Sequence, residues 1–162
     1  LEEITTALEK IAKDMRLVFP AHPRTRNTIS ESSIALRLKA ISNLVLLEPL
    51  GYLDFLCLES YAALVITDSG GLQEETTILG VPCMTLRDNT ERPVTITEGT
   101  NRLVHTTAKD ILENYREIKN SNKTNGGRIP KLWDGKAAER IANIIFMQSM
   151  LDGCLAKNSK LI

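Results

Sequence analysis

Residues 62–75 have the sequence AALVITDSGGLQEE, in which an apolar run leads into a glycine pair and then two glutamates. We interpret it as a buried strand, a tight turn and the beginning of a helix. The first N–H groups of a helix have no partner within it, and the positive end of the helix dipole lies at the same point. Because glycines allow close approach of the backbone, such a turn is suited to binding a phosphate group.

Glu75 lies one turn into the predicted helix, where a carboxylate can reach sugar hydroxyls beside a bound phosphate. The stretch therefore indicates nucleotide or nucleotide-sugar binding. The alternative is a purely structural turn, in which Ser69 only caps the helix. We favour ligand binding because the strand, the glycine pair and the glutamates occur together.

Strands and helices alternate along the rest of the chain. Apolar runs predict strands at residues 15–19, 43–47, 63–67, 82–86 and 101–104. Helical spacing predicts helices at residues 1–13, 24–40, 53–60, 72–79, 108–119 and 133–151. Because the strands are continuously apolar, we expect a three-layer α/β fold, with one parallel sheet covered on both faces.

Polar side chains follow the carboxyl ends of these strands: His22, Glu48, Asp68 and the segment 87–93. Ligands bind at this edge of open α/β sheets, so we place the site there. The two arginines of segment 87–93 could pair with phosphate, although a solvated loop is the alternative. For His22, a structural role and a chemical role both stay open.

Composition excludes several classes of function. The 162 residues suit one domain, and Lys+Arg equal Asp+Glu at 20 each, so we expect no nucleic-acid partner. We find no membrane-length apolar run and no signal peptide, and we predict a cytoplasmic protein without a membrane partner. Metal-binding, acyl-transfer and P-loop motifs are missing, so no metal is expected. The cysteines are predicted to be buried free thiols.

Four segments in combination resemble the non-hydrolysing UDP-N-acetylglucosamine 2-epimerases: DSGGLQEE at 68–75, LGVP at 79–82, LRDNTERP at 86–93 and EGTNRLV at 98–104. FPAHPRT at 19–25 and the stretch 49–55 fit the same family. The resemblance covers about residues 1–151. It implies two Rossmann-like domains in the glycosyltransferase-B arrangement, of which this chain is most of the C-terminal one.

The resemblance further implies that residues 1–162 are a single UDP-binding domain whose first strand is missing. The expected partners are UDP, UDP-N-acetylglucosamine and the N-terminal domain of the same enzyme, with no cofactor. Because the docking face of such a half should be apolar, a homodimer is also expected.

Substrate-binding roles are implied for six residues: Ser69, Gly70 and Gly71 at the diphosphate, Glu75 at the ribose, Arg92 at the substrate and Phe55 at the uracil. From pattern alone Phe55 would be a core residue. Leu50 stands where relatives often have glutamine. The main acid and base groups are expected in the N-terminal domain, so no catalytic residue is assigned, and His22 is not taken as one.

The implied reaction removes the proton from C2 of the sugar, expels UDP and adds it again, giving UDP-N-acetylmannosamine. The parent enzyme would supply cell-surface polysaccharide synthesis, whereas the isolated chain is expected to be inactive. Two alternatives stay open. One is the UDP-sugar-binding domain of a glycosyltransferase-B glycosyltransferase, and the other is a non-catalytic nucleotide-binding fragment.

Overall fold

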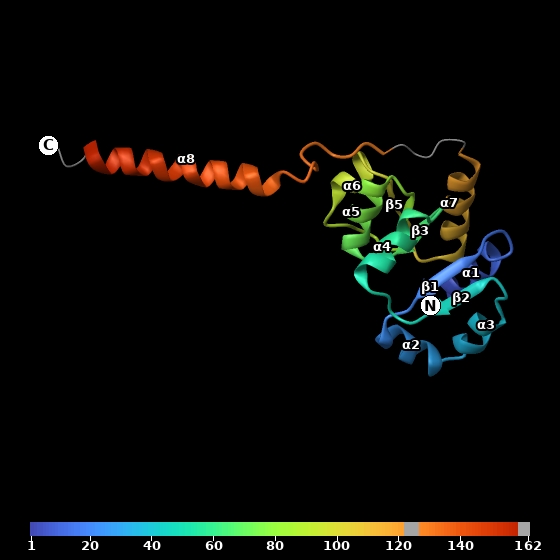
Figure 1. Cartoon of the computed structure of the whole chain (residues 1–162). Helices are drawn as coiled ribbons and strands as arrows, with labels where there is room; N and C mark the ends of the chain where they lie inside the picture. The colour runs from blue at the N-terminus through green and yellow to red at the C-terminus, as the bar shows by residue number, and fades with distance from the viewer. Residues whose placement is uncertain (122–126, 159–162) are drawn as a thin grey trace. The chain divides into compact units, whose positions relative to one another are not determined.

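A computed structural model describes residues 1–121 and 127–158, with the side chains of the last helix described as far as Leu151. The chain divides into two compact units, Leu1–Arg128 and Ile129–Ile162 (Figure 1). The first unit contains all the residues for which a binding role is expected.

The strands of the first unit are short and parallel. They are β1 (Leu17–Pro20), β2 (Leu44–Leu47), β3 (Val65–Thr67), β4 (Cys83–Thr85) and β5 (Asn101–Leu103). β1 pairs with β2, and the second sheet has the order β3-β4-β5, with Ile66 opposite Met84. The predicted strands are therefore confirmed within two residues at each end, and the parallel α/β class is correct.

One expectation about the sheet is wrong. The single predicted sheet is divided, since β1 and β3 exchange no ladder hydrogen bonds in the part of the chain that the structure describes. The rest of the chain also covers some strands less completely than others. β4 is fully buried, as predicted, but Val18 of β1 is 39% exposed and Leu46 of β2 is 43% exposed. An apolar run shows that a strand belongs in a sheet, but it does not show which strand lies beside it.

The helices of the first unit are α1 (Glu2–Ile11), α2 (Pro23–Ser30), α3 (Ile34–Ala40), α4 (Tyr52–Ser60), α5 (Gly70–Leu79), α6 (Pro93–Thr97) and α7 (Ala108–Asn120). The helix predicted at 24–40 is two helices. The hydroxyls of Ser30 and Ser32 bond to carbonyls three residues earlier, and such bonds compete with helix continuation. α6 was not predicted.

Two hydrophobic clusters stabilise this unit. α1 packs against α7, and their residues Ala7, Ile11 and Ile111 enclose Met84 of β4. The second cluster joins the end of α1 to α2 and α3 through Ala12, Ile29, Ile34, Leu38 and Ile41. Helices α5 and α6 contact β4 and β5, and α4 contacts α5.

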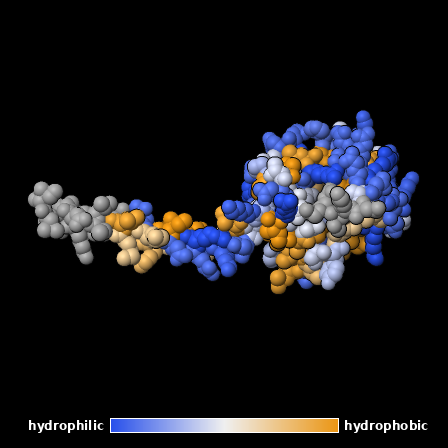
Figure 2. Space-filling model, turned by 90° about the horizontal axis from the view of Figure 1, so that it is seen from above, coloured by the Kyte–Doolittle hydropathy of each residue, from blue (hydrophilic) through white to orange (hydrophobic). Residues whose placement is uncertain are grey.

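The second unit consists mainly of α8 (Ala137–Asn158). An ion pair between Asp134 and Arg140 lies at its beginning. The helix was predicted to begin four residues earlier. Its apolar side chains are exposed as far as Leu151, and Figure 2 shows hydrophobic patches on it. Exposed members include Ile141, Ile144, Ile145, Phe146, Met147, Met150 and Leu151. Among the described residues, no helix is long and apolar enough to span a membrane.

Candidate functional site

The glycine turn has the conformation expected from the sequence. β3 ends at Thr67, and α5 begins at Gly70 and continues for ten residues. The backbone N–H of Ser69 donates to the hydroxyl of Thr67 at 3.0 Å, which fixes the turn. Ser69 occupies the N-cap position, but its side chain makes no capping hydrogen bond. At the other end of the helix, Gly80 has φ of 71° and terminates it.

The space in front of this helix is open. A Cβ atom added at Gly70 would meet nothing within 4 Å among the described residues, and one at Gly71 would meet only the Ser69 hydroxyl at 3.9 Å. Neither glycine has a positive φ. The packing of the chain therefore does not require these glycines, in contrast to Gly99, where a Cβ would lie 2.5 Å from the Thr95 carbonyl.

Gln73 joins the turn to its surroundings. Its side chain is fully buried, and its Nε2 donates to the Ser69 carbonyl at 3.3 Å. Its Oε1 accepts from the Thr90 hydroxyl at 2.6 Å and from Asn101 Nδ2 at 3.2 Å. One amide thus connects the glycine turn, segment 87–93 and β5. Sequence reasoning missed this role, although a glutamine among the buried positions of α5 was an available signal.

Segment 87–93 lies beside α5, as the sequence suggested. The Thr90 hydroxyl that bonds to Gln73 also accepts the backbone N–H of Arg92 at 2.9 Å. Arg92 Nε lies 2.8 Å from Glu74 Oε1, and the Arg92 side chain is 41% exposed. Arg87 pairs instead with Glu91 at 3.1 Å. The segment is therefore a fixed part of the site, and one of its two arginines is ion-paired to the helix that follows the glycine turn.

Phe55 and Glu75 lie on α4 and α5, two helices that pack together, and both side chains are half-buried. Phe55 belongs to neither of the two core clusters. Glu59 of α4, a residue that the sequence did not single out, has only 3% of its surface exposed. Burial first, and then the charge of Glu75, raises the pKa of Glu59 to about 7.

His22 and Glu48 occupy the carboxyl edge of the other sheet. His22 Nδ1 accepts the backbone N–H of Arg24 at 3.3 Å, so this histidine caps α2. Glu48 forms an ion pair with Arg26, beside a shallow hollow lined by Pro23, Arg26, Asn27, Ser30 and Glu48. These interactions favour the structural interpretation of His22, and they do not bring either residue to the glycine turn.

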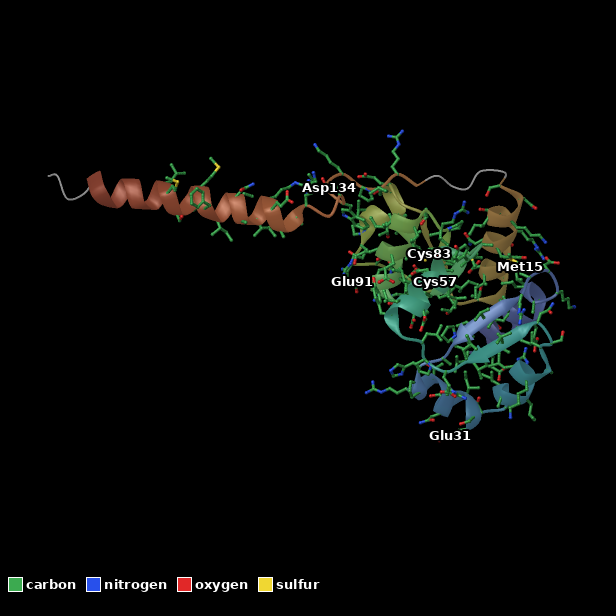
Figure 3. The ribbon with its side chains drawn as sticks, in the orientation of Figure 1. Met15, Glu31, Cys57, Cys83, Glu91 and Asp134 are labelled. Atoms are coloured by element: carbon green, nitrogen blue, oxygen red, sulfur yellow. The ribbon has the colours of Figure 1, made fainter. Side chains whose placement is uncertain are left out.

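The prediction that the cysteines are buried free thiols is correct for one of the two cysteines whose side chains are described. Cys83 is buried in β4, and its burial raises the pKa of its thiol, whereas Cys57 of α4 is exposed (Figure 3). Cys57 lies in an apolar run that is only partly buried, since the buried residue of α4 is Glu59. The side chain of Cys154 lies outside the described residues. Among the side chains described, no three His, Cys, Asp or Glu residues gather as metal ligands.

Comparison with known proteins places this geometry in a family. Residues 1–146 match the family model of the UDP-N-acetylglucosamine 2-epimerases. The chain belongs to this family. The epimerase of Methanococcus maripaludis is 40% identical over 148 residues, which are 90% of this chain and 40% of the relative. That of Escherichia coli K12 is 41% identical over 128 residues, or 75% of this chain and 33% of the relative.

Solved epimerase structures have the same fold. The Methanocaldococcus jannaschii enzyme in complex with UDP-GlcNAc and UDP has a TM-score of 0.78 at 39% identity, over 90% of this chain and 40% of that one. A Staphylococcus aureus structure with UDP has a TM-score of 0.74 at 28% identity, over 93% of this chain and 41% of that one. The glycosyltransferase-B-type epimerase fold is thus confirmed for this chain, which spans about 40% of the length of those relatives.

Proposed function

We propose that this chain is the nucleotide-binding part of a UDP-N-acetylglucosamine 2-epimerase. The observation that carries the proposal is the open space in front of Gly70 and Gly71, at the N-terminus of a ten-residue helix. Backbone N–H groups and the helix dipole favour an anion at this point. Membership of the epimerase family, and a structural neighbour solved with UDP-GlcNAc and UDP, support the diphosphate of UDP as this anion.

The neighbouring side chains fit the remaining parts of this ligand. Ser69, at the N-cap position, leaves its hydroxyl available for phosphate because it does not cap the helix. The guanidinium of Arg92 is partly exposed beside the same helix and can pair with a phosphate oxygen. Glu75 can accept hydrogen bonds from the ribose hydroxyls, and the ring of Phe55, outside both core clusters, can pack against the uracil.

The epimerisation itself requires the rest of the enzyme. We propose that the chain is the C-terminal domain, and that the acid and base groups come from the N-terminal domain. The division of the sheet between β1 and β3 supports the idea that a further parallel strand lies there in the complete domain. The exposed apolar residues of α8 suit contact with that second domain or with a second copy of the chain. A cytoplasmic location remains a prediction from the sequence.

Family membership favours an epimerase over a glycosyltransferase. The remaining alternative is a non-catalytic nucleotide-binding fragment, which would bind UDP but gain no epimerase activity when a separate N-terminal domain is added. Nucleotide binding itself is tested by calorimetric titration of the purified chain with UDP. We expect saturable binding, and we expect Glu75→Ala to weaken it by about tenfold or more, because hydrogen bonds to a charged group are lost.

The matched control for this titration is Glu113→Ala, which removes an exposed glutamate from α7 and should leave binding unchanged. Absence of binding by the wild-type chain would contradict the proposal. Turnover of UDP-N-acetylglucosamine by the chain alone would contradict the assignment of the acid and base groups to the other domain.

A further inference from the structure

Glu59 is a buried carboxyl group for which the fold provides no hydrogen-bond donor among the described residues. It lies in the last turn of α4, only 3% of its surface is exposed, and neither carboxylate oxygen has a hydrogen-bond donor among the described residues. An ionised carboxylate in such a place loses its hydration and gains nothing in return. The protein must therefore either neutralise Glu59 or provide a partner for it.

The surroundings of Glu59 contain no compensating cation in the part of the chain that the structure describes. From α5, the carboxylate of Glu75 faces it and adds a like charge. From β4, the buried thiol of Cys83 feels the charge of Glu59, and its Sγ lies 3.9 Å from the Thr85 hydroxyl. Burial first, and then the charge of Glu75, raise the pKa of Glu59 to about 7.

A contact between two carboxyl groups becomes a hydrogen bond only when one of them carries a proton. Glu59 is the more deeply buried of the two, and Glu75 is half-buried. The proton therefore belongs on Glu59, whose O–H can donate to Glu75. In this state the pair has one negative charge, and that charge is on the residue that faces the proposed ribose site.

We propose that Glu59 is a positioning residue, which in its protonated form donates a hydrogen bond to Glu75 and keeps that carboxylate oriented toward the hydroxyls of the nucleotide. The inference rests on the proposed role of Glu75. Deprotonation replaces the hydrogen bond by repulsion and adds a negative charge beside an anionic ligand. Nucleotide affinity should consequently fall as the pH rises through 7.

The first test observes the proton directly and needs no ligand. Glutamate carboxyl carbons of the ¹³C-labelled full chain are titrated by NMR between about pH 4 and 9, the range that spans ordinary and raised carboxyl pKa values. We expect one carboxyl with a pKa near 7, absent in Glu59→Gln and shifted downward in Glu75→Gln. Titration of every glutamate in the ordinary range would overturn the proposal.

The second test measures UDP affinity by calorimetry at about pH 6 and pH 8, on either side of the expected transition. Wild type should bind severalfold more weakly at the higher pH. Glu59→Gln, whose amide N–H donates at both pH values, should keep its affinity. Glu59→Met fills the same space without a donor and should bind weakly at both. Ionisation of the UDP phosphate affects all three proteins equally.

The comparison of Gln with Met separates positioning from packing, because a purely structural role would affect the two variants alike. Equal pH dependence in wild type and Glu59→Gln would overturn the inference. If wild type bound no UDP while one glutamate still titrated near 7, the proposed function would fail and the shared proton would stand.

Discussion

Single glycines in this chain serve two different purposes. Gly99 is surrounded by Thr77 and the Thr95 carbonyl, so its missing side chain is a requirement of packing. Gly70 and Gly71 face open space, so packing does not explain their missing side chains, and we propose that they leave room for the diphosphate. Substitution by alanine adds one methyl group at either kind of position. It therefore distinguishes a glycine that packing requires from one that faces open space.

Gly71→Ala is therefore expected to weaken UDP binding without harming the fold. Its stability should be unchanged or raised by up to about 1 kcal/mol, because alanine favours a helix over glycine. Gly99→Ala should instead lose about 1–3 kcal/mol through overpacking. Urea denaturation and UDP titration of both variants check this. Unchanged UDP affinity in a folded Gly71→Ala chain would show that the open space is not the phosphate site.

Glu59 should also make the stability of the fold depend on pH. Its pKa is about 7 in the folded chain, above the ordinary 4.5, so the folded state binds more protons between these values. Stability should thus be greatest below pH 4.5 for this group and decline as the pH rises to 7, by on the order of 3 kcal/mol in all. Urea denaturation should show the decline in wild type, and its persistence in Glu59→Gln would argue against Glu59 as its source.

At the scale of elements, the site is a junction between α5, segment 87–93 and β5. Gln73 makes this junction, because three polar groups from those elements meet on its buried amide. Arg92 adds an ion pair with Glu74 at the surface of the same junction. The segment therefore takes its position from α5, and not from its own sequence alone.

Gln73→Leu should loosen this junction. The half-buried hydroxyl of Thr90 would lose its acceptor, and the buried amide of Asn101 would lose one of its two acceptors, at a cost of about 2–4 kcal/mol. Hydrogen exchange should become faster at residues 87–93, and UDP affinity should fall with it. Thr97→Ala, which removes an exposed hydroxyl from α6, is the matched control. Unchanged exchange at residues 87–93 would show that Gln73 does not hold the segment.

Helices, strands and turns could be predicted from the local sequence, but contacts between segments far apart in the sequence could not. The apolar run, glycine pair and glutamates of 62–75 define β3, the turn and α5 without help from other segments. The bonds of Gln73 to Thr90 and Asn101 join residues 17 and 28 positions apart. Glu59 looked like an ordinary glutamate at a helix end, because only the packing of α4 on α5 shows that it is buried.

At the scale of the whole chain, the residues proposed to bind UDP all lie in the unit Leu1–Arg128. The other unit contributes α8, with exposed apolar residues that need a partner of their own. We therefore propose that nucleotide binding and contact with other domains belong to different units.

Removal of the second unit should consequently leave nucleotide binding intact. A chain of residues 1–128 is expected to bind UDP with the affinity of the full chain. It should also sediment as a monomer under conditions in which the full chain associates through α8. Calorimetry and analytical ultracentrifugation of the two chains check these outcomes. A large loss of UDP affinity would show that residues beyond 128 complete the site.

The proposed hydrogen bond between Glu59 and Glu75 couples nucleotide binding to proton uptake from the solvent. If protonation of Glu59 strengthens nucleotide binding, then nucleotide binding must strengthen protonation of Glu59 by the same factor. Near and above neutral pH, each binding event therefore draws part of a proton from the buffer. The heat of binding then includes the ionisation enthalpy of that buffer, and the protein takes up nucleotide and hydrogen ion together.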